Sequence, residues 1–153
     1  MNQTTSFGLW RFSKEYLSAA VLVGADPEHE ISPVRHYLLG HSAELVLKAF
    51  LLARGVSLKE LKTIGHDLER SLDRAKNLGL LNLVSIPPEE DYSVRLLSKT
   101  YKLKEHEYIV TGYRHWPQPA LMVSFIERIL MATQNLCIKD TKAVEAAQRP
   151  YSG

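Results

Sequence analysis

The sequence predicts an all-α fold, an antiparallel up-and-down bundle of about five helices. Apolar residues recur every three or four positions over long segments, which is the spacing of one face of an α-helix. Prolines and glycines interrupt this pattern between the segments, and no segment gives a convincing strand. The chain has 153 residues, of which 45% are hydrophobic and 24% charged, so it can bury one globular core.

The predicted helices are expected at residues 7–24, 33–54, 66–79, 91–108 and 119–138. Pro33 fits the first turn of the second helix, and Gly55 follows its end. Apolar residues cover more than half of the circumference of that helix, so we expect it in the centre of the bundle. His66 or Asp67 lies at the start of the third helix, and Gly79 lies at its end. The sequence does not indicate at which residue the fourth helix ends.

Smaller features complete the expected organisation. Residues 57–61 are expected to form a short turn, and Ser93 is expected to face solvent from the fourth helix. One helical domain is expected over residues 1–139, followed by a tail at 140–153 that lacks large apolar residues and should fray or form a loose final turn. The single cysteine, Cys137, lies in an apolar run and is interpreted as part of the core.

Composition and motifs narrow the classes of function. The formal net charge of +2 is well short of the dense basic surface of a dedicated nucleic-acid-binding protein, but it leaves a weak or local contact with RNA open. No apolar run approaches the roughly 20 residues that span a bilayer, and the N-terminus lacks the zones of a signal peptide, so we expect a cytoplasmic protein without membrane contact. Because no Gly-rich phosphate loop, serine elbow, HExxH motif or cysteine cluster occurs, neither a metal nor a cofactor is expected.

Three short motifs follow one another along the predicted helices. They are A-E-x-x-x-K-A at residues 43–49, G-H-D-L at residues 65–68, and a Tyr-Arg turn that ends in a proline at residues 113–117. Their order and spacing resemble those of the HEPN (higher eukaryotes and prokaryotes nucleotide-binding) domain family. The resemblance covers roughly residues 9–136.

The resemblance implies a helical bundle and several candidate activities. The HEPN family includes toxin ribonucleases, partners of minimal nucleotidyltransferases, and members that only bind or dimerise. Family members form their functional cleft between two protomers, which implies a homodimer. Fold alone does not fix which of these functions a member has.

The catalytic signature of the ribonuclease members is only partly present. It consists of an arginine followed, four to six residues later, by a histidine at the start of the last helix. In this chain His115 follows Arg114 directly. A spaced pair, Arg35 and His41, occurs on the second helix, where six helical steps separate the two side chains by about 120°. The two would converge only if Arg35 lay in an unwound first turn.

Polar residues on the second and third helices are candidates for a site. His41, Glu44 and Lys48 share one side of a helix, where they could hold a phosphate or shuttle a proton. They could instead form a polar stripe that ties helices together, because Glu44 and Lys48 stand in the favourable order for an ion pair. His66 and Asp67 could bind an anion at a helix start or simply cap that helix.

The turn before the last helix is the best candidate for nucleotide contact. Tyr113, Arg114, His115 and Trp116 combine cationic groups with aromatic faces, which is the composition needed to stack a base and neutralise its phosphate. The same aromatic side chains could instead pack a loop against the bundle.

We therefore expect a HEPN-like module that binds RNA, a nucleotide or a partner protein in a toxin–antitoxin or defence setting, with a nucleotidyltransferase-type antitoxin as a candidate partner. A metal-independent endoribonuclease is the alternative. In that case Arg35 or Arg114 would bind the scissile phosphate, and His41 or His115 would act as general base on the ribose 2′-hydroxyl. A purely structural interaction protein, with its polar stripe buried and fully paired, is the second alternative. The sequence does not decide whether the chain is an enzyme.

Overall fold

The computed structural model describes residues 3–102 and 116–149, and this part of the chain is all-α with no strand. It contains six α-helices and two short 3-10 helices. The α-helices are α1 (Ser6–Gly24), α2 (Pro33–Ala53), α3 (Leu58–Ile64), α4 (Leu68–Asn77), α5 (Pro88–Tyr101) and α6 (Pro119–Gln148). The 3-10 helices are η1 (Pro27–His29) and η2 (Leu80–Asn82). The predicted fold class is confirmed.

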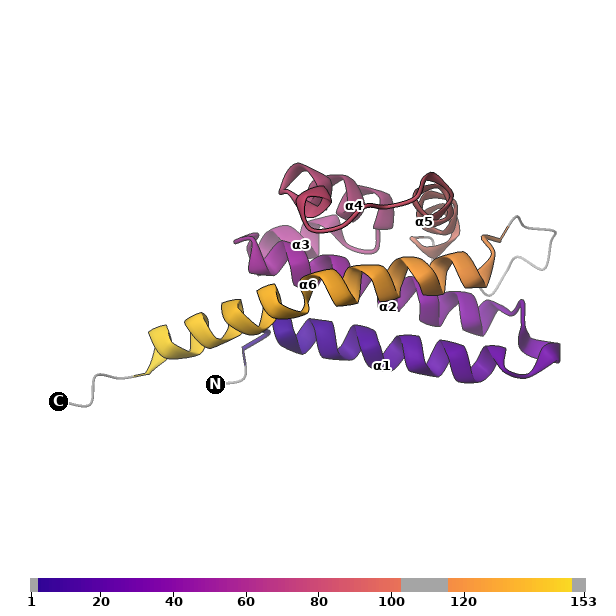
Figure 1. The fold of residues 1–153 in the computed structure, drawn as a ribbon, viewed down its shortest axis with the longest axis horizontal. Coiled ribbons are helices and arrows are strands. Elements are labelled where there is room, and N and C mark those ends of the chain that lie inside the picture. Colours follow the sequence, from indigo (N-terminus) through magenta and orange to yellow (C-terminus); the bar gives the residue numbers. More distant parts are fainter. Residues whose placement is uncertain (1–2, 103–115, 150–153) are drawn as a thin grey trace.

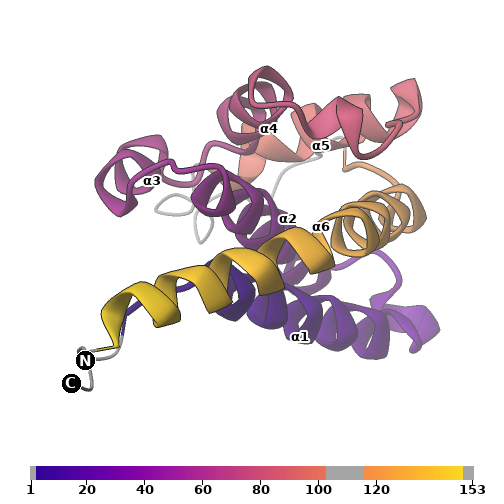
Figure 2. The same cartoon turned by 60° about the vertical axis from the view of Figure 1, so that its left-hand side comes forward.

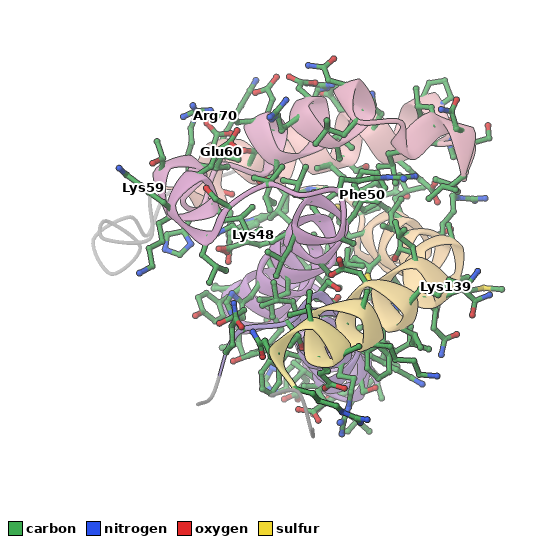
Figure 3. The ribbon with its side chains drawn as sticks, turned by 90° about the vertical axis from the view of Figure 1, so that its left-hand side faces the viewer. Lys48, Phe50, Lys59, Glu60, Arg70 and Lys139 are labelled. Atoms are coloured by element: carbon green, nitrogen blue, oxygen red, sulfur yellow. The ribbon has the colours of Figure 1, made fainter. Side chains whose placement is uncertain are left out.

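Helix α2 lies in the centre, as its wide apolar surface predicted. It contacts all five other α-helices. Helix α1 lies on one side of it and α3, α4 and α5 form a layer on the other side, while α6 packs beside α2 between α1 and α5 (Figures 1 and 2). Seen from the end of the bundle, Phe50 of α2 lies inside, whereas Lys59 of α3 and Lys139 of α6 reach the outer surface (Figure 3).

The core is built from the inward faces of these helices. Leu47 and Phe50 of α2 are fully buried beside Phe125 and Ile126 of α6 in one continuous cluster. Burying a side chain of this size contributes about 1.5–3 kcal/mol relative to leaving it in water. Cys137 belongs to the same cluster, and burial raises the pKa of its thiol to about 12. The interpretation of Cys137 as a core residue is confirmed.

Side chains at the helix starts accept hydrogen bonds from backbone N–H groups that would otherwise be unpaired. Thr5, Ser32, Ser57 and Asp67 accept from the backbone N–H three residues ahead, at distances of 3.0 to 3.1 Å. Such a cap is worth about 1 kcal/mol, because the first turn of a helix has no internal partners for its donors. Asp67 therefore fixes the start of α4 at the residue expected from the sequence.

Three expectations about local structure are wrong. Residues 58–64 form the helix α3 rather than a short turn, because Ser57 caps it and its apolar residues Leu61 and Ile64 are buried. Ser93 is buried and donates from Oγ to the Glu89 carbonyl oxygen at 2.8 Å, so it does not face solvent. Helix α6 continues to Gln148 instead of fraying after Ile138.

The extension of α6 is held by the start of α1. Ser6 donates from Oγ to an Asp140 carboxylate oxygen at 2.7 Å, and the Phe7 backbone N–H donates to Thr141 Oγ1 at 3.1 Å. Alanines at 143, 146 and 147 are strong helix formers, so propensity carries the helix on where large apolar residues end. The last turns of α6 project beyond the rest of the bundle (Figure 1).

Helix α6 is the one described helix that is long and apolar enough to cross a membrane by length and composition. A core helix passes the same test. Here Met122, Phe125 and Ile129 of α6 are fully buried, and the helix packs against α1, α2 and α5.

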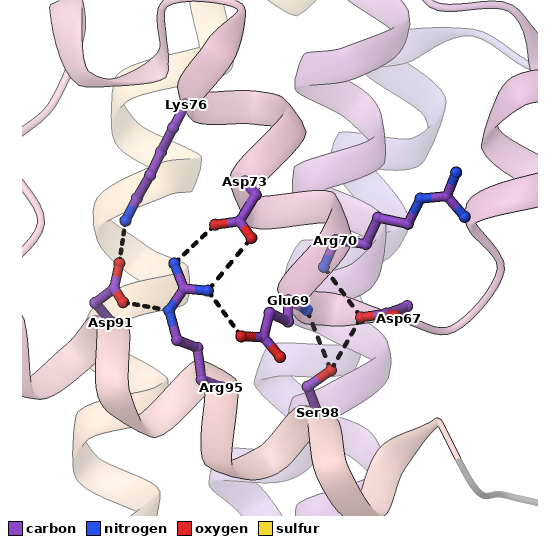
Figure 4. Close-up of polar contacts among 8 residues, drawn as sticks. All are labelled: Asp67, Glu69, Arg70, Asp73, Lys76, Asp91, Arg95 and Ser98. Atoms are coloured by element: carbon purple, nitrogen blue, oxygen red, sulfur yellow. Dashed lines mark hydrogen bonds and ion pairs between the residues drawn. The ribbon is translucent and has the colours of Figure 1, made fainter.

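A network of ion pairs joins α4 to α5. Arg95 of α5 contacts Asp73 at 2.8 Å and Glu69 at 3.0 Å on α4, and Asp91 at 2.7 Å on its own helix (Figure 4). Lys76 also pairs with Asp91. Burial alone raises the pKa of Asp91, but the hydrogen bonds and charges of Lys76 and Arg95 outweigh it and lower the pKa below its ordinary value. The ion pairs of Arg95 and Lys76 therefore hold α4 against α5.

Candidate functional site

A buried carboxylate on the central helix gathers polar side chains from three parts of the chain. Only 4% of the Glu44 side chain is exposed. His66 Nδ1 lies 2.9 Å from Glu44 Oε1, Lys48 Nζ lies 3.1 Å from the same oxygen, and the Tyr101 hydroxyl donates to Oε2 at 2.7 Å. His41 Nδ1 lies 3.6 Å from Oε2. We call these five residues the Glu44 cluster.

Local helix geometry places three members of the cluster. His41, Glu44 and Lys48 are separated by three and four residues, and this spacing brings side chains to the same side of a helix. Glu44 precedes Lys48 by four residues, which is the favourable order of an ion pair. The predicted polar stripe therefore exists as expected.

The remaining two members come from distant positions. His66 follows Gly65, which ends α3 with a backbone φ of 62°, a conformation that glycine adopts without a steric penalty. Tyr101 is the last residue of α5, and its ring lies against Gly40 of α2. A Cβ atom at residue 40 would stand 2.4 Å from Tyr101 Cδ2, so the absence of a side chain there lets the phenol reach Glu44.

The hydrogen bonds of the cluster determine which ring nitrogen of each histidine carries a hydrogen atom. An ionised carboxylate only accepts hydrogen bonds, so His66 Nδ1 carries the proton that it shares with Glu44. Tyr101 gives its one proton to Glu44, so its oxygen accepts from His41 Nδ1 at 3.1 Å. Both imidazoles therefore carry hydrogen on Nδ1, and when they are neutral each Nε2 is left as an acceptor.

The electrostatics of the cluster keep Glu44 ionised. Burial on its own raises the pKa of this carboxyl. The hydrogen-bonding partners His41 and Tyr101 and the charges of Lys48 and His66 outweigh burial, and they hold the pKa of Glu44 well below its ordinary value of 4.5. At neutral pH the cluster is thus built around one fixed negative charge.

The histidines are the accessible part of the cluster. Half of the His66 side chain is exposed, whereas His41 and Lys48 are partly exposed. Tyr16 meets the His41 ring edge-on at 4.4 Å, and Tyr37 stacks on it at 6.1 Å. Within the described residues, neither His41 Nε2 nor His66 Nε2 has a hydrogen-bonding partner.

The other candidate residues do not join the cluster. Arg35 lies at the corner between α1 and α2, where it donates to the carbonyl oxygens of Ala20 at 3.2 Å and Glu30 at 2.9 Å. It therefore braces a turn and shares no contact with His41. Asp67 caps α4, so the capping interpretation holds for it.

The turn before α6 lies partly outside the described residues, and Tyr113, Arg114 and His115 belong to that part. The Trp116 ring lies 4.3 Å from the ring of His36. His36 is buried, and its Nε2 lies 3.1 Å from the carbonyl oxygen of Pro117. Trp116 thus packs against the start of α2, as the loop-packing alternative expected.

Sequence reasoning missed the role of the tyrosines. The Tyr101 ring is buried in the core, and its hydroxyl completes the Glu44 cluster. The available signal was Gly40, a glycine inside a long helix, which often marks a close approach by another group.

The cluster has the groups for proton transfer and anion binding rather than for metal binding. Among the described residues no group of three or more His, Cys, Asp or Glu side chains is arranged to hold a metal ion. No protein-family model, curated protein or solved structure matches this chain. The function must therefore be argued from the site.

Proposed function

We propose that the protein is a HEPN-like helical module that binds RNA or a nucleotide, and that the Glu44 cluster takes the ribose-phosphate part of this ligand. One observation carries the proposal. A single buried carboxylate accepts from His66 Nδ1 directly and orients His41 Nδ1 through the Tyr101 hydroxyl, and neither Nε2 atom has a hydrogen-bonding partner within the described residues.

The charges of the cluster suit a phosphate. Glu44 and Lys48 balance each other, so protonation of either histidine gives the site a net positive charge. A protonated Nε2 donates to a phosphate oxygen, while a neutral Nε2 accepts from a ribose hydroxyl. Such charge-assisted hydrogen bonds are worth about 1.5–3 kcal/mol each.

Aromatic side chains beside the cluster suit a nucleobase. Tyr37 is partly exposed on the same helix as His41, and the two rings stack at a centroid distance of 6.1 Å. Unstacked bases of single-stranded RNA bind on aromatic faces of this kind. The proposed ligand is therefore a nucleotide or a single-stranded segment rather than a duplex.

The test measures binding of labelled single-stranded RNA and of ATP by fluorescence anisotropy at low and moderate salt. His66→Asn and His41→Asn are the informative variants, because an asparagine amide can replace the Nδ1 donor while Nε2 is deleted. Each is expected to weaken binding at least about fivefold, which corresponds to about 1 kcal/mol. His29→Asn is the matched control, since His29 is exposed on η1 and, among the residues that the structure describes, pairs only with Asp26.

The same experiment separates binding from a purely structural role. The contacts of Glu44 also join α2 to α5 and to the turn after α3. If the cluster were purely structural, the two asparagine variants would change the free energy of unfolding and leave ligand binding unchanged. Unchanged binding in both asparagine variants, or no binding by the wild-type protein, would refute the proposal.

A ribonuclease is the second candidate. His66 is held by the Glu44 carboxylate through Nδ1, an arrangement typical of general acids and bases, and His41 is held through the Tyr101 hydroxyl. One Nε2 would take the proton of the ribose 2′-hydroxyl, whose oxygen then forms a bond to phosphorus. The bond from phosphorus to the 5′-oxygen would break, and the second imidazole would protonate that oxygen. The products are a 2′,3′-cyclic phosphate and a 5′-hydroxyl, and no other reactant is consumed.

The ribonuclease candidate retains His41 from the sequence analysis and adds His66. Arg35 Nε and Nη1 donate to backbone carbonyl oxygens at the α1–α2 corner, so this guanidinium is held there rather than at the Glu44 cluster. Incubating the labelled RNA with the protein in the presence of EDTA tests it. A 2′,3′-cyclic end formed by the wild type and lost in His41→Asn and His66→Asn would support cleavage, whereas retention of intact RNA would leave binding as the function.

The family resemblance also suggests a setting for this module. A minimal nucleotidyltransferase acting as antitoxin remains our proposed protein partner, and co-purification from cells that express both chains would test it.

A further inference from the structure

A buried histidine near the start of α2 connects that helix to the segment that leads into α6. Only 1% of His36 is exposed. Its Nδ1 lies 2.9 Å from the carbonyl oxygen of Ser32, and its Nε2 lies 3.1 Å from the carbonyl oxygen of Pro117. The Trp116 ring packs against the imidazole at a centroid distance of 4.3 Å. The ring of His36 thus joins two parts of the chain that are 81 positions apart.

Both ring nitrogens of His36 face atoms that only accept hydrogen bonds. A carbonyl oxygen has no hydrogen to donate, so each of the two contacts requires a hydrogen atom on the imidazole. A neutral imidazole carries one ring hydrogen, whereas an imidazolium carries two. Only the protonated ring can therefore donate to both oxygens at once. His41 and His66 differ in this respect, because their contacts in the Glu44 cluster need hydrogen on Nδ1 alone.

No charged side chain compensates the charge of this ring. Among the described residues no ion pair includes His36. Arg35, the neighbouring residue on α2, directs its guanidinium to backbone carbonyl oxygens at the α1–α2 corner. The segment before α6 contributes Trp116 and Pro117 to the contacts of the ring, and neither of these residues titrates. Within the described part of the chain, backbone oxygens alone hold the proton.

We propose that His36 is a proton-dependent latch between α2 and residues 116–118. The protonated ring donates to both carbonyl oxygens and holds the segment against the helix. When the ring gives one proton to the solvent, one ring nitrogen becomes an acceptor that faces another acceptor. Ser32 lies within one turn of His36 on α2, whereas the contact with Pro117 joins separate parts of the fold. The contact with Pro117 is therefore the one expected to separate.

The latch holds at low pH and weakens as the pH rises. Histidine is the side chain whose charge ordinarily changes between about pH 5 and 8. The closed arrangement requires the second ring hydrogen and the separated arrangement does not, so removing protons shifts the equilibrium towards separation. This direction is opposite to that of Glu44, whose contribution to stability is lost as the pH falls because its pKa lies below the ordinary value.

The latch does not depend on the proposed function. His36 and His41 are five positions apart on α2, so their side chains leave the helix about 140° apart. Within the described residues no hydrogen bond, ion pair or ring contact joins His36 to the Glu44 cluster. A failure of either proposal therefore leaves the other unaffected.

Long-range nitrogen–proton NMR spectra of the labelled full chain measure the hydrogen on each ring nitrogen. Nuclear Overhauser contacts with the Trp116 indole identify the signals of His36 in the wild-type protein. At about pH 5.5 both ring nitrogens are expected to carry hydrogen, and at about pH 8 one of them should have lost it. The indole signal of Trp116 should shift over the same range. Trp10 is the internal control, because its indole donates to the Leu130 carbonyl oxygen and should not respond.

Thermal melting measures the effect of the latch on the fold. Glutamine can keep one donor at the place of Nε2 and does not titrate, so His36→Gln should melt below the wild type at low pH. This difference should shrink by about 3 °C between about pH 5.5 and pH 8. His29→Gln is the matched control, since His29 is exposed on η1 and, among the described residues, pairs only with Asp26.

The NMR spectra of the wild-type protein decide the proposal even if His36→Gln does not fold. A His36 ring with hydrogen on only one nitrogen at about pH 5.5 would overturn it. So would a ring that keeps both hydrogens at about pH 8, or a Trp116 signal that does not follow the loss of the proton from His36.

Discussion

Replacing Tyr101 by phenylalanine isolates one hydroxyl group at the centre of the candidate site. In the folded protein this hydroxyl donates to Glu44 Oε2 at 2.7 Å and accepts from His41 Nδ1 at 3.1 Å. The ring itself is buried against Gly40, and phenylalanine keeps that packing. Tyr101→Phe therefore removes hydrogen bonds without creating a cavity of the size left by a deleted ring.

The expected loss of stability follows from the charge of the acceptor. A hydrogen bond to an ionised, buried carboxylate contributes about 1.5–3 kcal/mol, more than a bond between neutral groups. For a domain of this length, each kcal/mol lowers the melting temperature by about 2–4 °C. The variant should accordingly melt about 3–12 °C below the wild type.

Urea unfolding followed by circular dichroism measures the free energy of unfolding, and an unchanged m-value would show that only stability has changed. Tyr92→Phe is the matched control, because Tyr92 is exposed and its change should lie within about 0.5 kcal/mol. A loss for Tyr101→Phe no larger than that of the control would refute the assignment of its hydroxyl to Glu44.

The remaining predictions concern charge, packing and reactivity. The pKa of Glu44 in the folded protein lies below its ordinary value of 4.5. The stability that this carboxylate contributes is therefore fully present above about pH 4.5, and it is lost as the pH falls toward and through the folded-state pKa. Glu44→Gln should destabilise the protein at pH 7, and its difference from the wild type should shrink in acid when urea unfolding is repeated from pH 7 to pH 2; a constant difference would contradict the assigned pKa direction. Gly40→Ala places a methyl group against the Tyr101 ring and is expected to cost about 1–3 kcal/mol by thermal melting, although alanine is the better helix former. Cys137 should resist thiol reagents at pH 8 in the native protein and react once urea unfolds it, because burial keeps the thiol protonated and covered; rapid labelling of the native protein would show that the C-terminal half of α6 opens.

Local signals in the sequence account for most of the helices. The starts of α2 and α4 were predicted from Pro33 and Asp67, because caps and first-turn prolines act within three or four residues. Helix α3 was underestimated, since its seven residues are too few to show a clear period. The end of α6 was placed too early because apolar periodicity reports burial, whereas alanine propensity and the contact with Ser6 extend the helix.

Local signals also predicted part of the candidate site. Helical periodicity alone placed His41, Glu44 and Lys48 on one side of α2, and the Glu44–Lys48 pair followed from their spacing. The same periodicity left Arg35 and His41 as a candidate pair, although the α1–α2 corner uses the guanidinium for backbone carbonyls.

The sequence by itself determined the helical class, the central place of α2 and the polar stripe on that helix, because each depends on interactions within one or two turns. Only the tertiary structure decided that His66 and Tyr101 meet Glu44, since these contacts join residues 22 and 57 positions apart in the chain. It also decided that the His36 ring meets the carbonyl oxygen of Pro117, 81 positions away. Contacts over such separations depend on how whole helices pack, and packing is set by the shapes of many side chains together rather than by any local pattern.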